Sequence, residues 1–226
     1  MPDWQAEAII LSVRPHGEGS AVISVLTADY GRHAGLVRGG ASSKMRGIMQ
    51  PGNRVRVSWR ARLSEQLGQM QIELIQSVPA LLLDSPLRLS GVASMCALLD
   101  AALPEREAQP GLFEGSAALL DVIVLDDDNV GWVEGYVRWE LGLLAAVGYR
   151  LDLARCVASG QTNDLAFVSP KSGGSVAGHQ AGSFAIWLLA LLMFLGCVSF
   201  GKHDLVAGLE LNGNFLSKHF LIAHHL

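Results

Sequence analysis

Cysteine and charge are both scarce in this chain of 226 residues. The only cysteines are Cys96, Cys156 and Cys197, which lie far apart in the sequence, so we expect no disulfide framework and a reducing, cytoplasmic location. Charged residues make up 17% of the chain and hydrophobic residues 50%, which excludes a disordered protein. The first residues lack the basic stretch of a signal peptide, and we expect none. The length fits one large domain or two small ones.

Motifs for covalent chemistry are also missing. No two histidines have zinc-protease spacing, and no Gly-x-Ser-x-Gly elbow occurs. Residues 196–203 (GCVSFGKH) come close to a phosphate-binding loop, but His203 stands where a Ser or Thr would bind Mg²⁺. We therefore expect no enzyme and no cofactor, with a nucleotide-dependent enzyme built on residues 196–202 as the weaker alternative.

Acidic residues are absent between Tyr30 and Ser64, a stretch that holds eight basic residues. Residues 1–80 contain nine basic and six acidic residues, a formal charge of +3, and the rest of the chain has a formal charge of −7. A polyanion close to the protein responds to such a local field more than to the net charge of −4. The asymmetry indicates an anionic partner for the N-terminal part.

The N-terminal part has the pattern of a small β domain. Short apolar runs alternate with Gly, Pro, Asn and Asp turn signals, which predicts a barrel or a sandwich. Five is the number of strands in an OB-fold. The predicted strands are residues 8–13, 21–26, 34–38, 54–63 and 69–75.

After Pro79 the apolar spacing becomes helical, which predicts an all-α second domain and a boundary between residues 79 and 80. Trp132, Tyr136, Trp139 and Leu143 form a stripe that we interpret as core rather than as a base-stacking surface. A Gly/Ser-rich irregular loop is expected at 156–182. The predicted helices are residues 81–103, 112–125, 132–147, 184–200 and 204–225.

Residues 184–200 form an apolar run of 17 residues without charge. This is at the lower limit of what spans a bilayer, and a helix buried on all sides has the same composition. Lys202 alone follows it, so no basic cluster sets an orientation. We favour a buried helix and no membrane contact; the alternative is a membrane-associated protein anchored by this run.

The residues from Arg54 to Leu63 carry the clearest functional signal. Arginines alternate with apolar residues, so a strand here would have one arginine face and one core face that includes Trp59 and Leu63. A solvated face usually mixes charges of both signs, and arginine suits phosphate because its planar group donates to two oxygens. We favour polyanion binding over a merely solvated face. The candidate DNA-binding residues are Arg32, Arg38, Lys44, Arg46, Arg54, Arg56, Arg60 and Arg62.

Several segments together resemble the RecO family of bacterial recombination mediators. The N-terminal part matches best, at residues 7–11, 14–18, 26–40 (LTADYGRHAGLVRGG) and 50–53, and residues 59–68 (WRARLSEQLG) continue it. In the second half, residues 139–144 (WELGLL) with 148–153 (GYRLDL) and Cys156 are similar to the helix before the family's zinc loop. The resemblance extends over most of residues 6–175. It implies an α+β protein in which an N-terminal five-stranded OB-fold barrel precedes an all-α domain, in agreement with the division drawn from the spacing.

The resemblance also implies a function and partners. Family members bind single- and double-stranded DNA, anneal complementary strands and, with RecR, load RecA onto DNA coated by single-strand-binding protein, without covalent chemistry. Many carry a four-cysteine zinc loop. Here Cys156 remains, but Ser159, Ala177 and Gln180 stand at the other ligand positions, with His179 beside them. One thiolate cannot make a closed tetrahedral site, so we expect no zinc.

Overall fold

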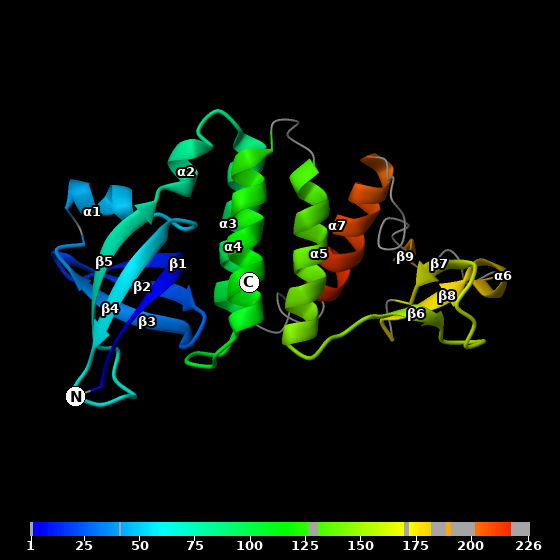
Figure 1. The fold of residues 1–226 in the computed structure, drawn as a ribbon, viewed down its shortest axis with the longest axis horizontal. Helices are drawn as coiled ribbons and strands as arrows, with labels where there is room; N and C mark the ends of the chain where they lie inside the picture. The colour runs from blue at the N-terminus through cyan, green and yellow to red at the C-terminus, as the bar shows by residue number, and fades with distance from the viewer. Residues whose placement is uncertain are drawn as a thin grey trace. The chain divides into compact units, whose positions relative to one another are not determined.

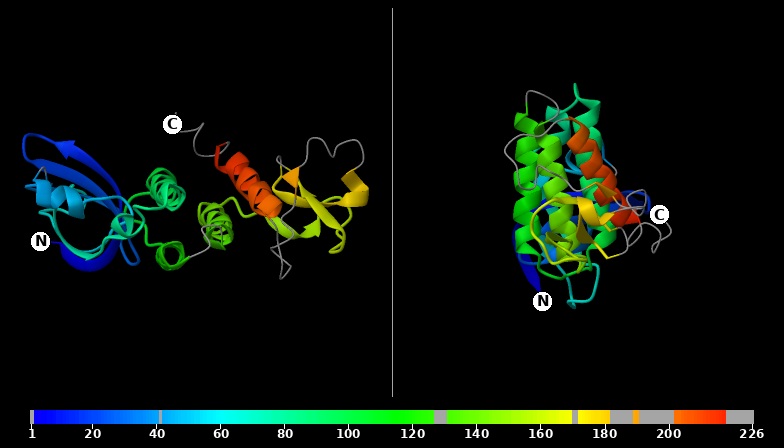
Figure 2. Two further views of the ribbon diagram at one scale, coloured as in Figure 1. Left: turned by 90° about the horizontal axis from the view of Figure 1, so that it is seen from above. Right: turned by 90° about the vertical axis from the view of Figure 1, so that its right-hand side faces the viewer.

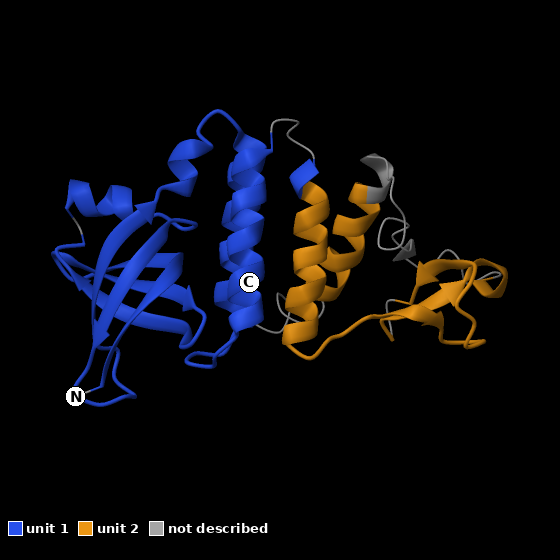
Figure 3. Ribbon diagram, viewed as in Figure 1, with its two compact units in different colours: residues 1–132 blue, residues 133–226 orange. Residues whose placement is uncertain are grey.

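The structure, a computed structural model, describes residues 2–40, 42–126, 131–169, 172–181, 189–190 and 202–217. The chain divides into two compact units, residues 1–132 and 133–226 (Figure 3). The boundary predicted between residues 79 and 80 coincides with the change from strands to helices inside the first unit, and as a domain boundary it stays a prediction.

A closed five-stranded barrel begins the first unit (Figure 1). Its strand order is β1-β2-β3-β5-β4, and β1 pairs with β4 to close it. Every pair is antiparallel except β3–β5, which is parallel and consists of the single pair Leu36–Gln69. This five-stranded Greek-key closure is that of an OB-fold, so the predicted fold class is confirmed. The strands are β1 (Asp3–His16), β2 (Ser20–Thr27), β3 (Gly31–Arg38), β4 (Arg54–Arg60) and β5 (Gln69–Gln76), with helix α1 (Ser43–Ile48) between β3 and β4.

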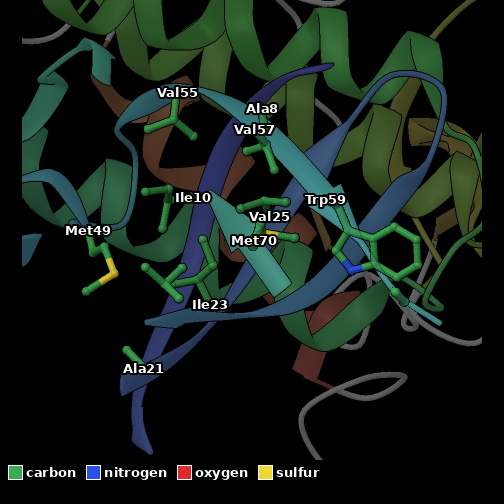
Figure 4. Close-up of a cluster of buried hydrophobic side chains, with 12 residues drawn as sticks. Ala8, Ile10, Ala21, Ile23, Val25, Met49, Val55, Val57, Trp59 and Met70 are labelled. Atoms are coloured by element: carbon green, nitrogen blue, oxygen red, sulfur yellow. The ribbon is translucent and has the colours of Figure 1, made fainter. Parts of the chain in front are cut away.

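The barrel core follows from the alternation of side chains along each strand. Ile10, Ile23, Val55 and Val57 are fully buried, and burying such a side chain contributes about 1.5–3 kcal/mol. Figure 4 shows Met49 and Trp59 of the same cluster at opposite ends of it. The predicted core face of β4 is therefore confirmed for its valines and for Trp59.

The predicted core position of Leu63 is wrong. β4 ends at Arg60, and Leu63 is 59% exposed. The Trp59 indole Nε1–H donates a 2.9 Å hydrogen bond to the carbonyl of Leu67, which holds the following loop, residues 61–68, folded back over the end of the strand. Because the strand stops here, the alternation that would have turned Leu63 inward also stops.

Three helices complete the first unit: α2 (Val78–Leu81), α3 (Pro86–Ala102) and α4 (Pro110–Leu125). α3 and α4 lie beside the barrel (Figures 1 and 2). α3 packs where Gly52 has a φ of +88°; a Cβ on Gly52 would lie 2.3 Å from Cγ1 of Val92. The Cys96 thiol donates to the carbonyl of Ile10 at 3.5 Å, and its burial raises the pKa to about 12. α3 therefore packs directly against the backbone of β1 and the turn at Gly52.

Two helices of the second unit carry the predicted aromatic stripe and a buried polar pair. α5 (Gly131–Ala146) begins at the end of the first unit, and α7 is Lys202–Leu216. Tyr136, Trp139 and Leu143 of α5 are buried, as the interpretation of the stripe as core required. Burial raises the pKa of Glu140 to about 7, while the amide of Asn212 on α7 donates to this carboxylate at 3.1 Å.

A small second sheet stands where an irregular loop was expected. Its order is β6-β8-β7-β9, and the short helix α6 (Gly178–Ala181) follows β8. The strands were missed because they are two to five residues long in a Gly/Ser-rich stretch. They are β6 (Asp152–Cys156), β7 (Leu165–Val168), β8 (Gly174–Ala177) and β9 (Leu189–Ala190).

Strand β9 corrects the helix predicted over residues 184–200. Leu189 and Ala190 pair with Val168 and Phe167 of β7, so the helix is wrong at these two residues, and the rest of the run lies outside the described residues. Uniformly apolar sequence does not distinguish a helix from a strand. Across the described residues, no helix combines the length and apolar character that a membrane crossing needs. Residues 196–201 of the loop-like motif also lie outside, and Lys202 begins α7.

Candidate nucleic-acid interface

The outward-facing side chains of β4 form a row with different neighbours along the strand: Arg54, Arg56, Ser58 and Arg60. Arg60 lies between Asp3 of β1 and Gln69 of β5, and Ser58 lies between Gln5 and Gln71. The same pairings place Arg56 between the carboxylates of Glu7 and Glu73. Arg56, in the middle of the row, therefore has two acidic neighbours, whereas Arg60, at the end of β4, has one acid and one amide beside it.

Arg54 and Arg32 are held within the first unit. The Arg54 guanidinium donates to both carboxylate oxygens of Asp121, at 2.8 and 3.2 Å, and to the carbonyl of Ala117, and so ties α4 to the barrel. Arg32 donates to the carbonyl of Leu103 at 2.7 Å and lies 3.5 Å from Asp100. These two predicted DNA contacts thus have partners within the protein. The charge pattern of the sequence could not separate them from arginines that are free to bind an anion.

The other six candidate residues have exposed side chains. The side chains of Arg56 and Arg60 are 56% and 71% exposed, and each has a carboxylate at 3.8 Å, Glu7 and Asp3 respectively. Such long, solvated ion pairs contribute about 0–1 kcal/mol, so they leave both guanidinium groups available to an anion. The remaining exposed cations are Arg38 at the end of β3, Lys44 and Arg46 on α1, and Arg62 after β4.

A groove of about 1140 Å³ brings three of these arginines together: Arg38, Arg60 and Arg62. It extends from Met45 of α1, past the facing parts of β3 and β5, to the 61–68 loop and the first residues of β1. Asp3 is its one acidic lining residue. The groove is thus a concave, net positive surface on the barrel.

An aromatic cluster missed by the sequence analysis supports one end of this groove. Trp4 stacks on Tyr30 at a ring distance of 4.3 Å and on Trp59 at 5.8 Å, while His33 meets the edges of both indoles. Burial, with a further effect of the Arg106 charge, lowers the pKa of His33 to about 4. The imidazole is therefore neutral at physiological pH. The sequence did carry a signal for this cluster: Trp4 is two residues before Ala6 and four before Ala8, so on a strand all three share the apolar face.

Arg106, between α3 and α4, fixes the 61–68 loop. Its guanidinium donates to the carbonyls of Ser64 and, at 2.9 Å, Gln66, and its backbone N–H donates to the carbonyl of Arg32. Arg106 has a φ of +64°, unfavourable for a residue with a side chain. The next residue, Glu107, lies directly against Gly31 of β3: a Cβ on Gly31 would lie 1.8 Å from the carbonyl oxygen of Glu107. We refer to this set of contacts as the Arg106 latch.

The second sheet contains the position of the expected zinc loop. The Cys156 thiol accepts a hydrogen bond from the backbone N–H of Ala177 at 3.3 Å. Its pKa is lowered to about 7, first by a hydrogen bond from Ser159 and next by this N–H. The described residues include no group of three His, Cys, Asp or Glu side chains placed to hold a metal ion. The donor set thus does not fit zinc, and a zinc-free protein stays a prediction.

A hydrogen-bonded pair of side chains, Asp164 and His179, lies near that position. Asp164, with a φ of +57°, accepts from the backbone N–H of His179 and lies 2.8 Å from its Nδ1. The imidazole lowers the pKa of the Asp164 carboxyl. This pair joins the start of α6 to the segment before β7 without a metal.

Two family models cover almost the whole chain. "Recombination protein O N terminal" matches residues 1–78 and "Recombination protein O C terminal" matches residues 83–219. The chain belongs to the RecO family. It is 47% identical over 226 residues to the DNA repair protein RecO of Rhodospirillum centenum, a match that covers 99% of this chain and 89% of that protein. The resemblance inferred from the sequence is therefore confirmed.

Other RecO proteins are similarly related. The identity is 45% over 217 residues with the DNA repair protein RecO of Jannaschia sp., covering 96% of this chain and 87% of the relative. It is 46% over 219 residues with that of Cereibacter sphaeroides, covering 96% and 90%. This chain is thus a DNA repair protein of the RecO family.

Proposed function

We propose that this RecO family protein binds single- and double-stranded DNA on its barrel without reading the base sequence. The observation that carries this proposal is the groove, in which Arg38, Arg60 and Arg62 face a single acid, Asp3. Guanidinium groups match the oxygens of phosphate, and each phosphate contact releases counterions from DNA. Phosphate contacts set position and affinity and carry no sequence information. Lys44, Arg46 and Arg56 extend the surface.

The same electrostatics support strand annealing. A strand whose phosphates are neutralised by arginine repels a complementary strand less, so pairing becomes easier. Family membership supports the rest of the proposal: cooperation with RecR, action on DNA coated by single-strand-binding protein, and loading of RecA in the cytoplasm, at the nucleoid. No bond is made or broken in these steps, which is why we propose a mediator rather than an enzyme.

The test is the salt dependence of binding. The affinity of the full chain for a single-stranded oligonucleotide should fall steeply with salt. In Arg60→Ala/Arg62→Ala, the slope of log affinity against log salt should decrease by about 1.4, which is 0.7 per lost phosphate contact. Titrations by fluorescence anisotropy at several salt concentrations measure this slope.

A matched control removes the same charge elsewhere. Arg138→Ala/Arg150→Ala also deletes two arginines, but from the second unit. Its slope should equal that of the wild type. If both double variants change the slope equally, net charge rather than the groove determines binding, and the assignment of Arg60 and Arg62 is wrong.

A further inference from the structure

The groove lies where a single backbone pair closes the barrel. β3 and β5 share only the pair Leu36–Gln69, whereas β2 and β3 are paired over their whole length. Next to this pair the strands stay in contact through side chains, since a Cβ on Gly35 of β3 would lie 2.9 Å from Cβ of Met70 of β5. Ile72 of β5 is only partly buried. We refer to this incompletely paired junction as the β3–β5 seam.

Glutamines, rather than charged residues, line the groove between its arginines. Gln69 and Gln71 belong to β5, Gln66 to the 61–68 loop and Gln5 to β1, and all four are exposed. Their side-chain amides have no hydrogen-bond partner among the described residues. A primary amide presents both a donor and an acceptor, so it matches the mixed donor and acceptor edges of nucleobases.

Stacking is not what this groove offers. Trp4 is partly buried and its ring stacks on those of Tyr30 and Trp59, and Trp59 is 3% exposed. Many single-strand binders rely on bases that stack on open aromatic faces. Here the available groups are amides, and hydrogen bonding is the interaction that remains for a base.

The size of the groove sets a further condition. Its volume of about 1140 Å³ lies above the range of about 300–1,000 Å³ for small-molecule sites, so more than one base fits. In a duplex the Watson–Crick edges are occupied by the partner strand. Only an unpaired strand can present these edges to the glutamines while its phosphates meet Arg38, Arg60 and Arg62.

We propose that the groove at the β3–β5 seam binds unpaired nucleobases through the amides of Gln5, Gln66, Gln69 and Gln71. This inference rests on the proposed DNA binding and adds to it a contact with the Watson–Crick edges of the bases, which duplex DNA does not expose. Four amides with both donors and acceptors fit any base, so the groove recognises the unpaired state rather than a sequence. Pairing with a complementary strand withdraws the base edges, which releases the annealed product from the glutamines.

The test uses an abasic probe. A single-stranded oligonucleotide and an abasic strand of equal length have the same phosphates, but only the first has base edges. Wild-type protein should bind the intact strand about tenfold more tightly, as expected for a few net hydrogen bonds, with equal salt slopes for the two probes. In Gln69→Leu/Gln71→Leu, which preserves the charge and removes the amides with only a small loss of side-chain size, the difference between the probes should shrink several-fold.

The matched control is Gln161→Leu/Gln180→Leu, which makes the same change at exposed positions of the second unit and should keep the difference. Equal affinity of the wild type for intact and abasic strands overturns the inference, while the salt slopes of the arginine variants still support DNA binding by the barrel. Absence of salt-dependent binding to either probe overturns both. Because the probe itself is varied, the wild-type result does not depend on the folding of any variant.

Discussion

Arginines of one strand row have different tasks in this protein. Arg54 and Arg60 have the same outward orientation on β4, yet Arg54 is forked onto Asp121 of α4, and the Arg60 side chain is 71% exposed at the groove. Residue type and spacing are the same for both. What separates them is the helix that packs over one end of the strand.

This difference gives a prediction for Arg54→Ala. The substitution removes hydrogen bonds to Asp121, Ala117 and Gln76, and should lower the free energy of unfolding by about 1–3 kcal/mol, toward the lower figure because Asp121 is half exposed. The salt slope for DNA should stay at the wild-type value. Denaturant unfolding and the binding titration measure the two quantities.

Arg56→Ala is the matched comparison for Arg54→Ala on the same strand face. Its carboxylate partner, Glu7, lies 3.8 Å away and is well exposed, so its loss should change the free energy of unfolding by less than about 1 kcal/mol. A loss of stability as large as that of Arg54→Ala would contradict the structural role assigned to the contact with α4.

The residue scale is also where sequence reasoning reached its limit. The alternation that predicted Val55, Val57 and Trp59 as core depends only on the two-residue period of a strand, and it held. Which outward arginines are free depends on α4 and on the α3–α4 connection, which are distant in the sequence. No local pattern records that Asp121 lies over Arg54 and Asp100 beside Arg32.

At the scale of elements, the Arg106 latch joins the α3–α4 connection to the barrel. It holds the carbonyls of Ser64 and Gln66, in the loop that forms one wall of the groove. A residue with a φ of +64° costs about 1 kcal/mol or more, which the surrounding hydrogen bonds offset. The latch therefore positions a groove wall although Arg106 is not among the residues that line the groove.

We expect Arg106→Gly to weaken binding of single-stranded DNA several-fold. Glycine accepts the backbone conformation without strain, so the variant isolates the loss of the guanidinium. The salt slope should stay unchanged, because Arg106 holds the loop and does not neutralise a phosphate. A slope reduced by about 0.7 would instead identify Arg106 as a direct phosphate contact and contradict the positioning role. Binding is measured well below the unfolding temperature of the variant.

Elements also show which parts of the fold were predictable. For helices α3, α4 and α5, at least one predicted end lies within two residues of the observed end. The helical apolar pattern continues over many residues in each, and Pro86 and Pro104 mark limits of the first. The second sheet was not expected, since its strands are short and its pairing joins distant segments. The aromatic cluster under the groove was missed for a related reason: Trp4, His33 and Trp59 meet only when the barrel closes.

At the scale of the whole molecule, the two units should respond oppositely to pH. His33 in the first unit has a pKa near 4 instead of 6.5, so the unfolded chain binds more protons and acidification from pH 6.5 to 4 destabilises the barrel. Glu140 in the second unit has a pKa near 7 instead of 4.5, so the folded state binds more protons. Its stabilisation is complete below pH 4.5 and is lost as the pH rises through 7.

Each effect should reach at most about 3.5 kcal/mol, since each pKa differs by about 2.5 from its ordinary value and one pKa unit corresponds to about 1.4 kcal/mol. Denaturant unfolding at pH 5 and pH 8 measures them. His33→Phe should remove the acid sensitivity of the barrel, and Glu140→Gln should remove the alkaline sensitivity of the second unit, with little effect of either on the other unit. Parallel pH responses of the two units would refute this account.

The β3–β5 seam has a consequence for amide hydrogen exchange. Amides in the long β1–β2 and β2–β3 ladders are released only when many backbone hydrogen bonds break together, so their exchange reports global unfolding. The N–H of Leu36 instead depends on one bond, to the carbonyl of Gly68, with no parallel ladder on either side. We expect it to exchange through a small local opening, so that amides released by global and by local unfolding are neighbours on β3.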